Sequence, residues 1–451
     1  MWAQQSIWHA IFDVFHSIQQ LATFFVGQYH RGEGSNMRLF RLILPLFLLT
    51  STLHADGNWP AWRGPNAAGA ALPGQYPANL SDPKQLAWKL PLPGKGCSTP
   101  VVWDKQILIT GPKEDQDTIT AISWDGKVNW NLSVGKQRPG KHRNGSGSNP
   151  SCVTDGKQVY AYFKSGNLAA ATLEGKLAWK INLKQYGNDT LFWDFGTSPV
   201  LTEKYLIMAL MRKGNSWLVA FDKATGKVTW KVERNYETPI EGDHSYATPI
   251  VTRRDGREEI LVWGAERFTA HDATNGKIIW TCSGFNPQEK KFWVAVSSFV
   301  LVDNMAVIPY GRGARLAGVA LGGKNDVTQT HRIWTIENKG TFVPSPATDG
   351  SKVYLVRDRG EVVCVNPADG KVEWESALPR DRASYYSSPT LADGKIYAAR
   401  EDGVLFVAQI KGGFKLLSEN DLGERLIASP VPVAGSLLIR GEKHLFCYRA
   451  K

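Results

Sequence analysis

Long apolar runs are missing from this sequence of 451 residues. A membrane-spanning helix needs about 20 consecutive apolar residues, and no such run occurs, so a multi-span membrane protein is excluded. Runs of charge are also missing: the 53 Lys and Arg residues exceed the 42 Asp and Glu residues, but they are spread along the chain. This distribution favours a solvated basic surface, with an anionic polymer or membrane surface as the alternative, and we expect no binding to nucleic acid.

Cysteine and histidine motifs are absent as well. The five cysteines stand far apart, without a C-x-x-C pair or a C-x-x-C-H sequence, which excludes zinc ribbons, redox dithiols and covalently attached haem. The histidines after residue 55 stand singly, without H-x-H or H-x-x-x-H spacing, so we expect no metal site. An odd number of cysteines leaves at least one free thiol. We expect the cysteines to be small, buried hydrophobic residues. The cysteines are Cys97, Cys152, Cys282, Cys364 and Cys447.

Glycine and tryptophan, in contrast, are abundant, with 43 Gly and 17 Trp. The hydrophobic share of 43% and the charged share of 21% are ordinary for a folded core and exclude a largely disordered chain. So many glycines indicate many tight turns, because glycine adopts the positive φ angles that hairpins require. The composition favours an all-β fold.

The first 55 residues precede the repeats described below. Residues 37–55 (MRLFRLILPLFLLTSTLHA) begin with arginines, continue with a short apolar stretch and end in a small residue, which is the layout of a secretory signal peptide. Residues 1–36 carry apolar residues at helical spacing, so they are either an amphipathic helix or an extension ahead of the true start at Met37, which we favour. The signal peptide predicts a periplasmic or secreted protein with no membrane span after cleavage.

Two motifs recur through the rest of the chain. The motif G-K-x-x-W occurs five times, and two further tryptophans continue its series. The seven tryptophans are Trp88, Trp130, Trp179, Trp230, Trp280, Trp334 and Trp374, and Leu417 stands where an eighth is expected. A small residue followed by proline interleaves with this motif at intervals of roughly 40–50 residues. These prolines are Pro100, Pro150, Pro199, Pro249, Pro346, Pro389 and Pro430, and the sequence SSF at 297–299 fills the remaining gap.

Each repeat predicts a four-stranded antiparallel unit. The first strand follows the proline, Asp-Gly and Thr-Gly-Lys sequences supply the turns, and the last strand ends in the tryptophan. The indole is long enough to reach the neighbouring sheet, so we expect these seven tryptophans to be structural residues that join neighbouring units. A four-stranded unit at this period is typical of a propeller blade.

The ends of the chain predict how the ring closes. There are eight first strands and eight last strands, but Trp88 precedes the first unit and nothing follows the third strand of the last one. Residues 84–90 are therefore expected to complete the last blade, which removes an open sheet edge. The sequence predicts an eight-bladed β-propeller of four-stranded blades over residues 56–451.

The motifs resemble those of a known superfamily. The sequence AFDKATGKVTW, the S-x-P starts and the opening NWPAWRGPNAAG at 58–69 are similar to bacterial exported propellers of the pyrroloquinoline-quinone (PQQ)-like type. The resemblance covers residues 58–450 and implies the propeller fold. It leaves function open, because the superfamily includes quinoprotein dehydrogenases as well as the scaffold lipoprotein of the outer-membrane β-barrel assembly machine.

The loops that lead from the last strand of one unit to the first strand of the next are long and rich in polar and aromatic residues. They converge at one mouth of a propeller's channel, so they either bind a polar or anionic ligand there or simply form a solvated rim. The candidate ligand-binding residues are His142, Arg143, Asp194, Asp243, His244, Trp293, Arg382, Tyr385 and Arg425. His271 lies in a turn, where we expect a structural role.

No set of residues predicts catalysis. The quinoprotein dehydrogenases use adjacent cysteines, acidic and Asn calcium ligands and a catalytic Asp, whereas this chain has no adjacent cysteine pair and no haem domain. We therefore expect no cofactor and no catalytic residue. The predicted function is that of a monomeric, non-catalytic binding or scaffold propeller of the bacterial cell envelope, with an envelope protein or polysaccharide as partner. The alternatives are a dehydrogenase dependent on PQQ and calcium, and a carbohydrate-binding propeller.

Overall fold

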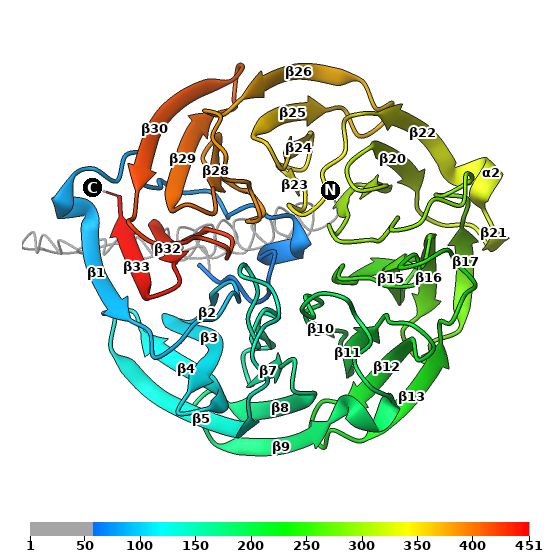
Figure 1. The fold of residues 1–451 in the computed structure, drawn as a ribbon, viewed down its shortest axis with the longest axis horizontal. Coiled ribbons are helices and arrows are strands. Elements are labelled where there is room, and N and C mark those ends of the chain that lie inside the picture. The colour runs from blue at the N-terminus through cyan, green and yellow to red at the C-terminus, as the bar shows by residue number, and fades with distance from the viewer. Residues whose placement is uncertain (1–56, 451) are drawn as a thin grey trace, which may run out of the picture. The chain divides into compact units, whose positions relative to one another are not determined.

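The computed structural model describes residues 57–450, so the predicted extension (1–36) and signal peptide (37–55) lie outside the described residues. Eight sheets, the blades, stand around a central axis, which Figure 1 shows from above. The prediction of an all-β, eight-bladed propeller is confirmed. None of the helices within residues 57–450 is long and apolar enough to cross a membrane.

Each blade has four strands, which are named A to D from the central axis to the outer edge of the ring. Blade 4 gains a short fifth strand, described below. Blade 1 consists of β2 (Val101–Trp103), β3 (Gln106–Lys113), β4 (Gln116–Ser123) and β5 (Val128–Lys136). Blade 2 consists of β6 (Val153–Thr154), β7 (Gln158–Tyr162), β8 (Asn167–Thr172) and β9 (Leu177–Asn182). Blade 3 consists of β10 (Val200–Leu201), β11 (Tyr205–Leu210), β12 (Trp217–Asp222) and β13 (Val228–Glu233). Blade 4 consists of β14 (Ile250–Arg254), β15 (Arg257–Gly264), β16 (Arg267–Asp272) and β17 (Ile278–Cys282).

The remaining blades follow the same order. Blade 5 consists of β18 (Val300–Val302), β19 (Met305–Tyr310), β20 (Arg315–Ala320) and β22 (Arg332–Glu337). Blade 6 consists of β23 (Ala347–Thr348), β24 (Val353–Val356), β25 (Glu361–Val365) and β26 (Val372–Ala377). Blade 7 consists of β27 (Thr390–Ala392), β28 (Lys395–Ala399), β29 (Val404–Gln409) and β30 (Lys415–Asp421). Blade 8 consists of β31 (Val431–Val433), β32 (Ser436–Arg440), β33 (His444–Arg449) and β1 (Leu86–Pro91).

The N-terminal strand completes the last blade, as the sequence predicts. In blade 8 the strands follow the order β31, β32, β33 and β1, and Leu90 stands opposite Leu445. The pairing continues past the strand, since Leu92 N donates to Lys443 O at 2.8 Å. The first and last strands of the described residues are thus joined in one sheet, and no blade is left with three strands.

Burial follows the position of a strand within its blade. Strands B and C are buried on both faces, as in β11 and β12, because they lie between two neighbouring blades. Strands D alternate between exposed and partly buried residues, as in β13, because only their inward face meets another blade. The core therefore consists of a series of apolar layers between blades.

The tryptophans of strand D dock on the next blade. Trp179 Nε1 donates to Lys223 O at 2.8 Å, and its indole covers Gly226, where a Cβ would lie 2.6 Å from the ring. Gly226 also has a φ of 70°, so glycine is required both by the turn and by the indole. The same pair of contacts, to a backbone oxygen and to a turn glycine of the next blade, is made by Trp88, Trp130, Trp179, Trp230 and Trp334.

Two of the seven tryptophans lie in different surroundings. Trp280 is fully buried and pairs with Asn325, because an insertion in blade 5 adds a short parallel strand, β21 (Asn325–Asp326), to the edge of blade 4. The helix α2 (Thr328–His331) follows it. Trp374 packs between the rings of Tyr354 and Phe414. The insertion breaks the repeat and is not predicted by the sequence motifs.

A ring of buried hydroxyl groups joins the inner ends of the blades. Just ahead of strand A in seven of the blades, a backbone N–H donates to the Ser or Thr hydroxyl at the equivalent place in the next blade, as from Thr248 N to Ser298 Oγ at 2.8 Å. Seven such steps run from Thr99 through Ser151, Ser198, Thr248, Ser298 and Ser345 to Ser388, and from Ser429 back to Thr99. We call these eight residues the hydroxyl belt.

The docked tryptophans lead to a stability prediction. Trp230→Ala removes an indole that is half-buried between blades 3 and 4 and bonded to Ala273 O at 3.0 Å. We expect it to lower the free energy of unfolding by about 3 kcal/mol in a urea titration. The matched control is Trp193→Ala, whose side chain is 51% exposed and should change stability little. Equal stability of Trp230→Ala and the parent would contradict the docking role.

Strand β16, just before the turn into β17, contains a buried histidine in a fixed tautomer. His271 is 0% exposed; its Nδ1 donates to Gly276 O at 2.8 Å, and its Nε2 accepts from Thr269 Oγ1 at 3.0 Å. Arg234 in turn donates to Thr269 Oγ1 at 2.9 Å. Burial, followed by the nearby Arg234 charge, lowers the pKa of His271 to about 3, so the folded protein keeps this ring neutral.

This histidine makes stability depend on pH in a defined direction. The unfolded chain binds a proton at His271 below about pH 6.5 while the folded chain does not, so stability falls as the pH decreases below 6.5. Between pH 8 and pH 5, this one group should remove about 2 kcal/mol. We expect urea unfolding to show a loss over this interval that is larger in the parent than in His271→Gln by about that amount. Parallel pH profiles would show that His271 does not contribute.

Candidate functional site

A cavity of about 690 Å³ lies at the mouth of the central channel. Most of its lining comes from the loops that lead from strand D of one blade to strand A of the next, named D–A loops here. Further lining comes from the turns between strands B and C of blades 5 and 6. The D–A loops meet at one place because every strand A starts on the same side of the ring.

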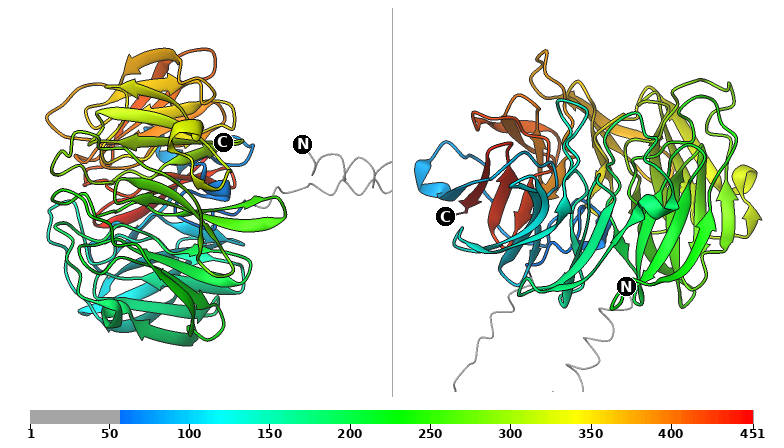
Figure 2. Two further views of the ribbon diagram at one scale, coloured as in Figure 1. Left: turned by 90° about the vertical axis from the view of Figure 1, so that its right-hand side faces the viewer. Right: turned by 60° about the horizontal axis from the view of Figure 1, so that its bottom comes forward.

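The segment 58–71 forms the floor of this cavity. Its backbone bonds to strands A of blades 1, 2, 6 and 7 near the ends that lead into the turns between strands A and B. The partners are Val102, Thr154, Thr348 and Leu391. Because the D–A loops join the opposite ends of these strands, the segment crosses the hub below the mouth; Figure 2 shows it, in blue, on one face of the ring. Trp62 in this segment lines the cavity.

Arg63 ties the floor to two blades. Its guanidinium donates to Pro346 O at 2.8 Å and to Pro389 O at 2.9 Å, which are backbone oxygens at the starts of blades 6 and 7. The side chain is buried, and burial lowers its pKa to about 9, so it stays charged at neutral pH. A Cβ at Gly69 would lie 2.0 Å from this guanidinium, which explains a glycine there. The W-R-G-P sequence thus builds the hub.

Asp194 organises the first wall. Its carboxylate accepts from Lys141 N at 2.7 and 2.9 Å and from His142 N at 3.0 Å, and it forms a buried ion pair with Lys164. Lys164 also donates to Pro139 O at 2.8 Å. These contacts hold the D–A loop 137–149 of blade 1 against blades 2 and 3. The Asp194 carboxylate is therefore occupied by structural contacts.

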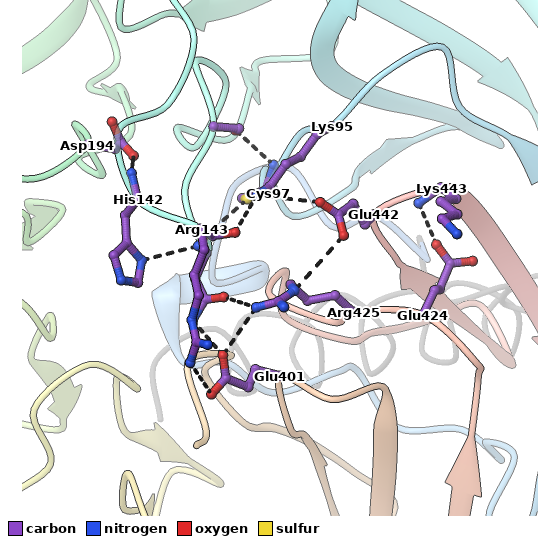
Figure 3. A network of polar contacts seen from close by, with 12 residues as sticks. Lys95, Cys97, His142, Arg143, Asp194, Glu401, Glu424, Arg425, Glu442 and Lys443 are labelled. Carbon is purple, nitrogen blue, oxygen red and sulfur yellow. Dashed lines mark hydrogen bonds and ion pairs between the residues drawn. The ribbon is translucent and has the colours of Figure 1, made fainter. Parts of the chain in front are cut away.

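Glu401 holds the same loop from the other side, in the network that Figure 3 shows. Asn144 Nδ2 donates to Glu401 Oε2 at 2.7 Å, and Ser384 N donates to Oε1 at 3.1 Å. Arg425 lies 3.3 Å and Arg143 lies 3.5 Å from this carboxylate. The loop 137–149 therefore spans the mouth from blade 3 to blade 7, and both arginines are paired at its edge.

Aromatic side chains line the space between these two anchors. The His142 ring lies 5.4 Å from the Trp193 ring in an edge-on arrangement and 6.3 Å from the Tyr386 ring. His142 Nδ1 accepts from Asn144 N at 3.1 Å, so the neutral ring carries its proton on Nε2. All three aromatic side chains line the cavity.

The structure brings only some of the predicted residues into the cavity. His142 and Asp194 line it, and Arg143 and Arg425 stand at its edge through Glu401. Tyr385 does not reach it: this residue is 1% exposed and lies in the core, 6.0 Å from the Phe406 ring. The neighbouring Tyr386 takes its place.

The other predicted residues lie around the mouth but outside the lining. They are Asp243, His244, Trp293 and Arg382. His244 is buried beside Phe192, its Nε2 lies 3.8 Å from Asp243 Oδ1, and burial lowers its pKa. Within residues 57–450, no three His, Cys, Asp or Glu side chains form a group that could hold a metal ion.

Sequence reasoning missed two arginines of the lining. Arg312 and Arg359 lie in the turns between strands B and C of blades 5 and 6, and both face the cavity. The repeat pattern indicates that ligand-binding residues come from the D–A loops. The turns between strands B and C lie on the same side of the ring, so they also contribute residues to the cavity. A signal was present, because both turns contain Arg-Gly after strand B.

An apolar rim adjoins the cavity over blades 2 to 4. Four side chains from three consecutive D–A loops are about half exposed: Phe192, Trp193, Ile240 and Phe292. Phe292 N donates to Ile240 O at 2.7 Å, so two of these loops are joined. Large apolar side chains gathered at a cavity entrance are typical of an interaction surface.

The sequence matches a known family over most of its length. The PQQ_2 family model, described as outer membrane protein assembly factor BamB, matches residues 74–281, 174–325 and 323–443. The chain belongs to this family. The resemblance to PQQ-like propellers is thereby confirmed, while no curated protein matches the sequence.

Solved structures of low sequence identity share the fold. BamB from Moraxella catarrhalis is 15% identical with a TM-score of 0.54, over 79% of this chain and all of that protein. Quinohemoprotein alcohol dehydrogenase from Comamonas testosteroni is 12% identical with a TM-score of 0.60, over 88% of this chain and 81% of that protein. A europium-containing methanol dehydrogenase is 11% identical with a TM-score of 0.64, over 87% and 89%. Such neighbours show the fold alone.

The buried pair beneath the mouth leads to a prediction. Asp194→Asn leaves the Lys164 ammonium buried without its counter-ion, so we expect a loss of about 3–5 kcal/mol in the free energy of unfolding. Limited proteolysis should also cut the loop 137–149 faster. The control is Glu337→Gln, because its ion pair with Arg315 at 2.8 Å is exposed and should affect stability little. If both variants unfold at the same urea concentration, the pair does not organise the mouth.

Proposed function

We propose that this chain is a non-catalytic binding propeller of the bacterial cell envelope, whose mouth receives a partner protein. The observation that carries the proposal is the open cavity with an adjoining apolar rim, formed by loops that several buried contacts hold in place. The family description as an outer membrane protein assembly factor supports a protein partner. The signal peptide predicted at residues 37–55 supports export to the envelope.

The chemistry of the cavity supports binding over catalysis. Its two carboxylates are Asp194, which is paired with Lys164, and Asp358, which accepts from Phe342 N at 2.8 Å and Val343 N at 3.1 Å. Neither carboxylate is free to act as a general base. Burial raises the pKa of Asp358, but its oxygens stay occupied by these backbone groups.

The same carboxylates decide whether the cavity could hold the PQQ and calcium that the fold family implies. Calcium takes six to eight oxygen ligands, and carboxylates usually supply several of them. Here Asp194 and Asp358 would first have to give up their N–H and ammonium partners. The residues of this cavity therefore do not fit a calcium-bound quinone.

Variants of the rim test the proposed function. The full-length protein would be cross-linked in envelope extract as the parent, as Trp193→Ser/Phe292→Ser and as the control Leu177→Ser/Val228→Ser, which changes equally exposed apolar residues on outer strands. We expect the rim variant to lose its specific partners by about tenfold or more, since apolar anchors dominate protein interfaces, while the control keeps them. Unchanged melting points would show that all three proteins are folded.

Two results would count against this assignment. Partners that are lost with the control and kept with the rim variant would move the interface to the outer edge of the blades. A protein that retains PQQ after dialysis and reduces it in the presence of an alcohol would be an enzyme.

A further inference from the structure

We propose that the cavity binds a carboxylate of the partner protein, either its C-terminal carboxylate or that of an acidic residue, between the guanidinium groups of Arg312 and Arg359. The inference rests on the proposed function, because it assigns the chemistry by which that mouth recognises its partner. Arginine suits this task, since its planar guanidinium binds a carboxylate through two parallel hydrogen bonds.

Arg312 is held in a strained turn at the cavity. It lies between Gly311 and Gly313, and all three residues have positive φ angles, of 64°, 55° and 82°. A positive φ is uncommon for a residue with a side chain and is often found at ligand sites. The guanidinium lies 4.1 Å from the Phe342 ring, and no carboxylate of residues 57–450 lies within 4 Å of it. The carboxylate of Glu241 acts on Arg312 only from further away.

Arg359 is likewise exposed and without a counter-ion. Its Nη1 donates to the backbone oxygen of Arg382 at 3.1 Å, and among the described residues no carboxylate lies within ion-pair distance. The neighbouring Arg357 turns inward and donates to Gly340 O at 2.8 Å. Arg312 and Arg359 come from equivalent turns of adjacent blades and both line the cavity, so they occupy neighbouring positions around the mouth.

The carboxylates of the lining do not pair with these arginines. Asp194 is paired with Lys164, and Asp358 accepts from two backbone N–H groups, so neither forms an ion pair with Arg312 or Arg359. The cavity therefore presents two guanidinium groups without a counter-ion, with the aromatic rings of Trp193 and Tyr386 also lining it. This combination suits a carboxylate that is attached to an apolar or aromatic neighbour.

The shape of the cavity favours a protein segment over an anionic polysaccharide. The floor that contains Trp62 prevents a polymer from running on through the channel, and 690 Å³ is the size of a pocket for one small ligand. A polypeptide terminus or a single side chain enters such a dead end without bending. The adjoining rim is apolar, which matches a protein surface better than a hydrated glycan.

A peptide array tests this inference directly. The full-length protein would be titrated on a library of random eight-residue peptides, each made with a free C-terminal carboxylate and as the amide, and with Asp or Glu replaced by Asn or Gln. We expect the bound peptides to lose about tenfold or more in affinity when the carboxylate is removed, and to bind more weakly at high salt. Arg312→Gln and Arg359→Gln should cause a loss of the same size, and Arg312→Lys a smaller one.

The control variant is Arg253→Gln, which changes an arginine of similar exposure near the opposite ends of the strands and should bind as the parent does. Peptides that bind equally with and without carboxylates, or equally to the Arg312→Gln/Arg359→Gln double variant, would overturn the inference, as would the absence of any bound peptide. Tighter, arginine-dependent binding of oligogalacturonate would assign the site to a polysaccharide instead. If the cross-linked envelope partners require the rim but not the two arginines, the proposed function stands and this inference fails.

Discussion

The ring depends on the hydroxyl belt at the inner ends of the blades. There a backbone N–H just ahead of each strand A is buried between two blades, and leaving such a group unsatisfied would cost about 1–3 kcal/mol. A Ser or Thr of the next blade accepts this hydrogen bond in seven of the eight steps; between blades 7 and 8, Ser387 Oγ instead donates to Ala428 O at 3.1 Å. The belt holds neighbouring blades together where the ring is narrowest. At the outer strands, docked tryptophans join five of the eight neighbouring pairs of blades, so these pairs are fixed at both ends.

The belt also determines where a site can form. The belt residues lie where each D–A loop leads into strand A, so the D–A loops are gathered around one opening. The segment 58–71 adds the floor. Its Arg63 donates to the backbone oxygens of Pro346 and Pro389, which come directly after the belt residues Ser345 and Ser388 in the sequence. The cavity is therefore bounded by contacts that also close the ring, which gives it rigid walls without any dedicated domain.

Local repeats explain why the fold was predictable while much of the site was not. A turn glycine and a docked indole leave the same signature in most blades, so blade number and closure follow from spacing. A residue belongs to the belt because of its hydroxyl group, and a following proline is not required. In blade 2 the linking residue is Ser151, after Pro150, and in blade 5 Ser298 precedes Phe299. In the irregular loops no periodicity says which side chain points inward. Tyr385 enters the core and Tyr386 the cavity, and Arg312 and Arg359 come from turns that the loop pattern does not include.

The acidic side chains of the mouth hold its loops in place. Asp194 and Glu401 anchor the two ends of the loop 137–149, and Asp358 holds the D–A loop of blade 5. Loops that use their carboxylates to hold one another in place leave cations and aromatic rings facing the open space. Such a surface offers charge and apolar area to the partner that we propose. In that function the acidic residues of the D–A loops face the protein, while the basic and aromatic residues face the partner.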